Sequence, residues 1–132
     1  MAKLKSKNYY PPDDRSFAAS VWRRKMHKLL WTFLATHPKM VKSQWPVFKT
    51  LPSIPESDCY ACEEGGGSCN NCPIKDWGDG TGACLTESPK GSYYEQWCEV
   101  DIDTKKGLAL RKILALKIVK AWPAPKAEDF NK

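Results

Sequence analysis

Five cysteines between residues 59 and 84 have the side chains and the spacing that can hold a metal ion. They form Cys59-Tyr-Ala-Cys62, then Cys69-Asn-Asn-Cys72, and then, after eleven intervening residues, Cys84. Cysteines three residues apart across a tight turn can direct both thiolates at one metal, at about 2.3 Å for zinc. The sequence therefore predicts a structural zinc site based on the first pair and completed from the rest, with the candidate ligands Cys59, Cys62, Cys69, Cys72 and Cys84.

Other uses of these cysteines remain open at this stage. Four thiolates also hold an iron–sulfur cluster, and an even number of cysteines can form disulfides or a redox-active pair. Residues 1–7 lack an apolar run after their basic residues, so no secretory signal is expected and a reducing cytoplasm is the expected compartment. A metal is favoured over disulfides for that reason, with zinc as the leading metal and an iron–sulfur cluster still open. The sixth cysteine, Cys98, follows an aromatic stretch and is expected to be a buried apolar residue rather than a ligand.

Length and composition limit the architecture and the kinds of partner. The chain has 132 residues, a formal net charge of +6 and no run of about 20 apolar residues that would predict a membrane span. We expect a flexible basic arm over residues 1–14, one zinc-stabilised domain over 15–122 with its metal loop at 59–84, and a flexible tail over 123–132. The positive charge favours an anionic partner, either a nucleic acid or an acidic protein surface.

The first long helix is expected to begin near Asp14 or Ser16, which can cap it, and to end near His37, before Pro38. Both histidines of the chain, at positions 27 and 37, are expected at the surface or at a boundary. At 100° per residue one arc of this helix is apolar and the other is basic. The expected apolar arc contains Ala18, Ala19, Trp22, Met26, Leu29, Leu30 and Phe33.

The basic side of this helix gives one candidate binding site. Arg23, Arg24 and Lys28 lie near Trp31, and a tryptophan beside cations can stack a base while the cations hold phosphate. In the other interpretation Trp31 packs beneath the cysteine loop or the arm, because a large aromatic residue on a small domain is more often buried.

A second long helix is expected from Asp103 or Thr104 to Trp122, because Pro123 and Pro125 prevent its continuation. A short helix is expected over residues 92–99. The expected core arc of the long helix is Leu110, Ile113, Leu114, Ile118 and Trp122, and other apolar residues lie outside this arc. These residues, together with two aromatic residues of the short helix, are the candidate partner-binding surface: Tyr93, Trp97, Leu108, Leu116 and Val119.

The fold class expected from these patterns is mainly α, with two long helices packed around a loop-rich, zinc-stabilised knuckle made by the two CxxC pairs. Catalysis has no sequence support: the chain contains no His-Glu-x-x-His motif, no nucleophile elbow and no phosphate-binding loop. A zinc ion held by four thiolates has no open position for a substrate. We therefore expect a protein that is not an enzyme.

The order Trp45-Pro46, Cys59-x-x-Cys62, Cys69-x-x-Cys72-Pro73, Trp77, Cys84 and Tyr94-x-x-Trp97 resembles a loose set of small cysteine-rich proteins of phages and prophages of Gram-positive bacteria. The resemblance covers about residues 45–97. It implies a metal-binding accessory protein in the cytoplasm of the bacterial host cell. The leading hypothesis is a zinc-stabilised protein that docks on a host or anti-phage defence protein, and the alternative is a nucleic-acid binder that uses the basic first helix and the arm.

Overall fold

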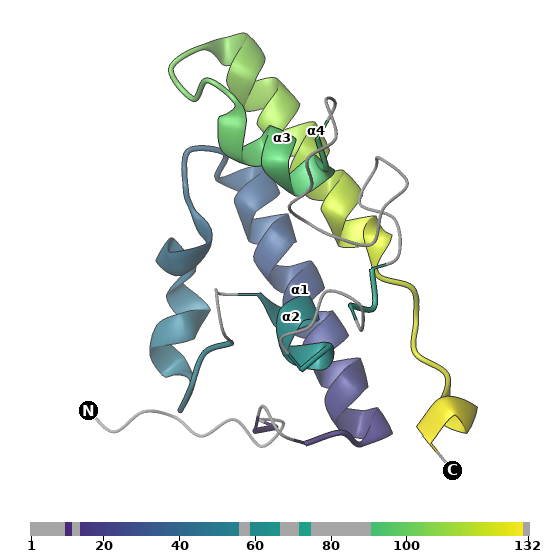
Figure 1. Ribbon diagram of the computed structural model, residues 1–132. Coiled ribbons are helices and arrows are strands. Elements are labelled where there is room, and N and C mark those ends of the chain that lie inside the picture. The colour runs from purple at the N-terminus through teal and green to yellow at the C-terminus, as the bar shows by residue number, and fades with distance from the viewer. Residues whose placement is uncertain (1–9, 12–13, 56–58, 67–71, 75–90, 131–132) are drawn as a thin grey trace.

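The computed structural model describes residues 10–11, 14–55, 59–66, 72–74 and 91–130. Their secondary structure is helical, without a strand among the described residues, which confirms the expected mainly α class (Figure 1). No helix in this part of the chain is long and apolar enough to cross a bilayer. The elements are α1 (Phe17–Thr36), η1 (Lys42–Gln44), η2 (Pro46–Thr50), α2 (Tyr60–Glu64), α3 (Tyr93–Glu99), α4 (Lys105–Ala121) and η5 (Ala127–Phe130).

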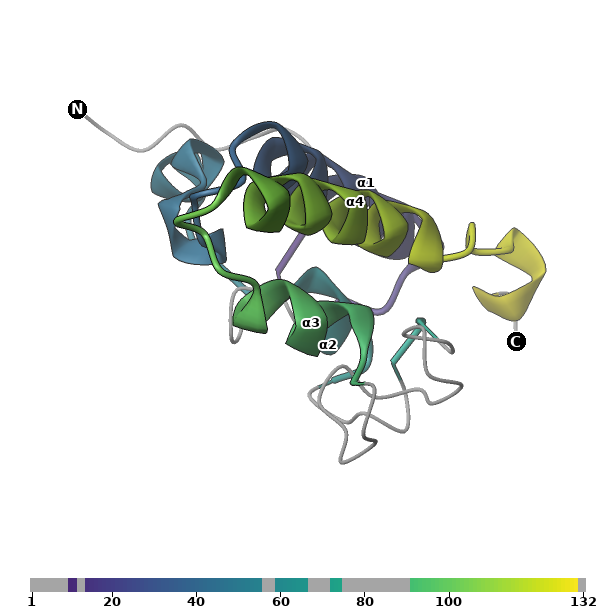
Figure 2. The ribbon, with the colours of Figure 1, turned by 90° about the horizontal axis from the view of Figure 1, so that it is seen from above.

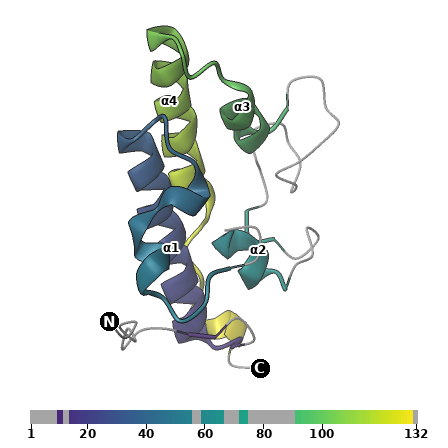
Figure 3. The same cartoon turned by 90° about the vertical axis from the view of Figure 1, so that its left-hand side faces the viewer.

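The helices form two layers. The long helices α1 and α4 run antiparallel and lie side by side, and the short helices α2 and α3 cover one side of that pair (Figures 2 and 3). Side chains from both layers and from η2 share one hydrophobic core. The opposite side of the α1–α4 pair carries neither α2 nor α3.

Helix α1 has the expected bounds, for the expected reason. The Ser16 hydroxyl accepts a hydrogen bond from the Ala19 amide at 3.1 Å, which satisfies one of the N–H groups that a helix leaves without a partner at its start. The helix ends one residue before His37, because Pro38 disfavours helical geometry in the residue that precedes it.

The apolar arc predicted for α1 is wrong at its edges. Ala18 and Leu29 are exposed, whereas Arg23 and His27 are buried. The buried side of the helix is therefore turned toward two polar residues. Both are tolerated inside because their nitrogen atoms bind acceptors from distant parts of the chain.

His27 joins α1 to α4, so its expected position at the surface was wrong. Its Nε2 lies 2.9 Å from the Ile118 carbonyl oxygen, and its ring packs edge-on against Trp122 at 5.2 Å between centroids. Next to it, Arg24 Nε donates to the Trp122 carbonyl oxygen at 2.8 Å. The other histidine, His37, is exposed, as expected.

Stability is expected to depend on pH through His27. Burial away from water lowers the pKa of His27 to about 4, from about 6.5 in an unfolded chain. Between these values the unfolded chain binds a proton that the folded chain excludes, so stability falls by about 3 kcal/mol as the pH drops from 6.5 to 4. Urea unfolding at several pH values measures this slope. A His27→Gln variant keeps a donor for Ile118 and should show a shallower slope, and an unchanged slope would contradict the assignment.

Helix α4 begins after Thr104, whose hydroxyl accepts from the Gly107 amide at 2.9 Å, and it ends before Trp122, as predicted. Position 107 has no space for a side chain, because a Cβ there would lie 1.8 Å from the Asp101 carbonyl oxygen. The short helix α3 also lies where it was predicted, with Ser92 and Glu95 forming a capping box.

The core arc predicted for α4 is wrong for two of its five residues. Leu114, Ile118 and Trp122 are buried, but Leu110 and Ile113 are exposed. The physical reason is Arg111, whose guanidinium group lies 3.8 Å above the Trp97 ring centroid. It donates hydrogen bonds to the carbonyl oxygens of Trp97, Pro38 and Met40, at distances between 2.6 and 3.1 Å. Arg111 therefore occupies a place in the buried arc of α4, and Leu110 and Ile113 lie outside that arc.

The predicted tail contains the short helix η5, and the Phe130 ring lies 5.6 Å from the Phe17 ring at the start of α1. The flexibility of the tail and of the N-terminal arm stays a prediction. The last two residues and most of the arm lie outside the described ranges.

Candidate functional site

The first CxxC pair lies at the start of α2. Cys59 caps this helix, and its sulfur accepts a hydrogen bond from the Cys62 amide at 3.3 Å. Both side chains are half-buried. Two sulfurs on one helical turn, with a backbone N–H directed at one of them, are compatible with two of the four ligands that a tetrahedral zinc site needs.

The surroundings of Cys59 favour its thiolate, which is the form that binds metal. A hydrogen bond from the Cys62 side chain lowers the pKa of Cys59 to about 7, with smaller contributions from the Cys62 amide and from the positive charge of Lys42. Burial opposes this shift. The lowered pKa of Cys59 favours the form of this side chain that coordinates a cation.

The other cysteines divide into three cases. Cys72 is buried, two residues before the fully buried Ile74. Cys69 and Cys84 lie outside the described residues. Cys98 is exposed on α3, so its expected burial was wrong. Among the described residues no three potential ligands come together, and the complete zinc site stays a prediction.

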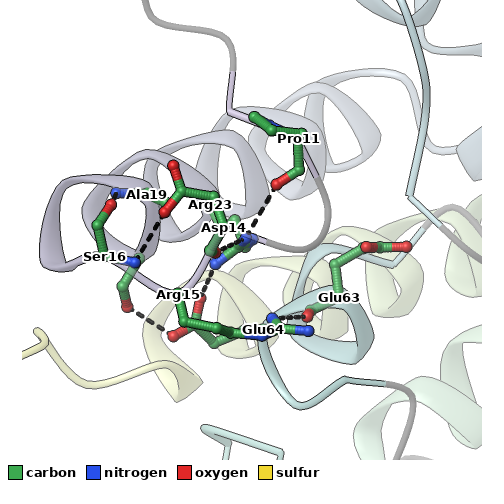
Figure 4. Close-up of polar contacts among 9 residues, drawn as sticks. Pro11, Asp14, Arg15, Ser16, Ala19, Arg23, Glu63 and Glu64 are labelled. Atoms are coloured by element: carbon green, nitrogen blue, oxygen red, sulfur yellow. Dashed lines mark hydrogen bonds and ion pairs between the residues drawn. The ribbon is translucent and has the colours of Figure 1, made fainter.

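A buried ion pair fixes α2, and with it the CxxC pair, against α1 (Figure 4). Arg23 donates to a Glu64 carboxylate oxygen at 2.9 Å, and it also donates to the carbonyl oxygens of Pro11 and Asp14. The Ser20 hydroxyl donates to the other Glu64 oxygen at 2.7 Å. The Arg23 side chain is 2% exposed and that of Glu64 is 16% exposed, so solvent screens this pair little.

A further contact from the start of α1 reaches the same short helix. Arg15 Nη1 donates to the Glu63 carbonyl oxygen at 2.8 Å. This carbonyl is near the end of α2, where main-chain acceptors lack helical partners. Helix α2 has only five residues and is too short to be stable alone, so its position depends on such contacts with α1.

Two of the four residues proposed for nucleic-acid binding are buried. Arg23 is 1% exposed and Trp31 is 4% exposed. The Trp31 ring packs edge-on against Trp97, with 4.9 Å between centroids, and against Tyr94 on α3. Arg24 is half-buried and bonded to the end of α4, and Lys28 is half-buried as well. The structure therefore places neither a stacking aromatic residue nor two adjacent exposed arginines at this position of α1.

The residues proposed for partner binding also separate. Trp97 is a core residue beneath Arg111, and Tyr93 is half-buried, with the Lys117 ammonium group 5.3 Å from its ring centroid. Leu108 and Val119 are half-buried, whereas Leu116 is 39% exposed. Leu110 and Ile113, which sequence reasoning assigned to the core, are 46% and 50% exposed. We call Leu110, Ile113 and Leu116 the outer stripe of α4.

A shallow hollow of about 310 Å³ lies at the N-terminal half of α1. Its lining is mostly apolar, with one charged side chain, and it contains none of the described cysteines or histidines. The lining residues are Tyr10, Ala18, Val21, Trp22 and Lys25.

No family model, curated protein or solved structure matches this chain.

Proposed function

We propose that this protein is a small non-enzymatic accessory protein, stabilised by zinc, that docks on another protein through the outer stripe of α4. The zinc ligands in this proposal are Cys59 and Cys62, with the remaining places filled from Cys69, Cys72 and Cys84. The resemblance to phage and prophage proteins supports a partner in the bacterial host cell, either a host protein or an anti-phage defence protein that the docking modulates.

The exposure of the outer stripe is the observation that carries this proposal. Three large aliphatic side chains lie at positions i, i+3 and i+6 of one helix, each more than one third exposed. Ile113 and Leu116 lie opposite the buried arc of Arg111, Leu114 and Ile118, and Leu110 lies at the edge of that arc. Burying such side chains against a partner gains about 25 cal/mol per Å² of apolar surface, and apolar centres are typical of protein interfaces.

Nucleic-acid binding remains the second candidate, because Arg24 and Lys28 keep part of their surface and the chain is basic. It is less well supported than docking, since Arg23 and Trp31 form part of the core. Binding to several phosphates would also weaken steeply as salt is raised, whereas docking through aliphatic side chains would weaken little.

Serine substitutions in the outer stripe are expected to abolish retention of the partner while the fold survives. Leu110→Ser, Ile113→Ser and Leu116→Ser together remove the apolar centre of the surface, and each exposed site should change stability by only about 0.5 kcal/mol. The measurement is retention of a protein from a Gram-positive host lysate on the immobilised chain at moderate salt, with circular dichroism to verify folding.

The matched control uses two equally exposed aliphatic residues of the other long helix. Val21→Ser with Leu29→Ser removes side chains that are 43% and 47% exposed on α1. This variant should retain the partner at the wild-type level. Equal retention by the stripe variant and the wild type would contradict the proposed docking surface.

A further inference from the structure

The long helices differ from the rest of the molecule in charge. Together α1 and α4 contain ten lysines and arginines and no aspartate or glutamate. The acidic residues of the other described α-helices lie on α2 and α3, in the second layer. They are Glu63, Glu64, Glu95 and Glu99.

The three arginines of this basic layer bind the chain itself. Arg23 binds Glu64, Arg24 binds the Trp122 carbonyl oxygen, and Arg111 binds three carbonyl oxygens. The exposed cations of the two helices are therefore lysines, which act as point charges and lack the planar fork that holds phosphate in a bidentate manner. These lysines are Lys25, Lys105, Lys106, Lys112, Lys117 and Lys120.

Three of the four exposed apolar residues of α4 also follow the spacing of a coiled coil, and the fourth, Leu110, lies beside this row. Ala109, Ile113 and Leu116 are all exposed and are separated by four and then three residues, which is the a/d pattern of a heptad repeat. Lys106 and Lys120 occupy the next a positions on either side. We call these five residues the heptad seam.

Lysines also flank the heptad seam. Lys105 and Lys112 fall at g positions, and Lys117 falls at an e position, where charged side chains select the partner in coiled coils. The seam covers 15 residues from Lys106 to Lys120, and these 14 residue steps span about 21 Å of helix.

We propose that the heptad seam of α4 binds one helix of a partner protein, with aliphatic residues at its own a and d positions and carboxylates at its e and g positions. This inference rests on the proposed docking function and specifies the partner's chemistry. Two heptads bury a small area, so the complex is transient and its selectivity comes mainly from charge.

The same charges disfavour two other occupants of this face. A second copy of the chain would place the lysines at e and g against lysines, which is repulsive in coiled coils. A nucleic acid would neutralise the lysines but would leave the aliphatic side chains of the seam against phosphate and sugar. An acidic amphipathic helix satisfies both kinds of side chain.

Two synthetic peptides test the proposal with the full-length protein. Both have three heptads with leucine at a and d; the acidic probe has glutamate at e and g, and its basic twin has lysine there. Fluorescence anisotropy of the labelled peptides measures binding. The acidic probe should bind at least about tenfold more tightly than the basic twin. Equal affinity for the two peptides would overturn the proposal.

Charge reversal distinguishes the seam from a general effect of net charge. Lys105→Glu with Lys112→Glu should weaken binding of the acidic probe about tenfold. Lys25→Glu with Lys39→Glu changes the net charge equally, at exposed positions outside α4, and should change binding less than twofold. Equal losses in the two variants would overturn the proposal.

Two further outcomes would contradict the proposal that the partner presents an acidic helix. One is a single-stranded oligonucleotide that binds more tightly than the acidic probe and is lost in the Lys105→Glu, Lys112→Glu variant. The other is a natural partner that the outer-stripe variant loses but the Lys105→Glu, Lys112→Glu variant keeps. In the second case the docking function would stand, and the acidic helix would be wrong.

Discussion

The proposed zinc site predicts that replacing Cys59 or Cys62 by serine removes the metal and most of the cooperative unfolding transition. A serine at position 59 can still cap α2, so the change removes a metal ligand with little effect on helix capping. Structural zinc contributes about 10 kcal/mol or more in small zinc-finger peptides, which is comparable with the total stability of many domains, about 5–15 kcal/mol. Metal analysis of the purified protein and thermal unfolding measure the two effects.

Cys98→Ser is the matched control for these variants. Cys98 is an exposed cysteine outside the predicted ligand set, on α3, so its replacement should leave the zinc content and the melting temperature unchanged. Unchanged zinc content and melting in both the Cys59 and Cys62 variants would rule out the zinc model. If the purified protein contains iron and no zinc, the cysteine ligands of the proposed site stand, and the cofactor is an iron–sulfur cluster.

The second large effect is expected for the ion pair that holds α2 against α1. Arg23→Met leaves the Glu64 carboxylate without its cation in a site that solvent hardly reaches. Breaking a buried pair in this way typically costs about 3–5 kcal/mol, because one charge stays buried alone. Urea unfolding measures the cost, and a similar loss of zinc affinity is expected because α2 carries the CxxC pair.

The double variant Arg23→Met, Glu64→Met separates charge burial from lost packing. It removes both charges and should be more stable than Arg23→Met alone, since no uncompensated carboxylate remains. Lys25→Met, at an exposed position on the same helix, should stay within about 0.5 kcal/mol of the wild type. A single variant as stable as the Lys25→Met control would contradict the role given to Arg23.

The ends of the helices could be predicted from the sequence because their determinants are local. Ser16 and Thr104 cap the long helices through amides three residues away, and Pro38 and Pro123 follow soon after the helices end. Periodicity also predicted that Leu114, Ile118 and Trp122 lie inside.

The buried polar residues could not be predicted, because their partners are far away in the chain. Arg23 binds a carboxylate 41 residues later, His27 binds a carbonyl oxygen 91 residues later, and Arg111 binds one 73 residues earlier. Residue type alone favours exposure for such side chains, and only the tertiary fold supplies the acceptors that make burial tolerable.

The contrast between local and distant contacts also determined which surface residues the sequence could predict. Leu116 was correctly placed outside the core, but Trp97 was expected at the surface and Leu110 and Ile113 in the core. The guanidinium group of Arg111 covers Trp97, and this buried arginine takes a place in the inner arc of α4 that residue type alone does not predict. The candidate docking surface therefore emerges from the structure, whereas the cysteine motif is readable in the sequence.

The most direct test of the docking function uses the immobilised wild-type chain to retain material from a host lysate. The ratio of absorbance at 260 nm to that at 280 nm is measured for this material before and after a high-salt wash. Docking on a protein predicts a protein spectrum that persists through the wash and is missing from the outer-stripe variant. A nucleic-acid spectrum that the wash removes, equally strong in the stripe variant, would contradict protein docking and assign the basic layer to nucleic acid.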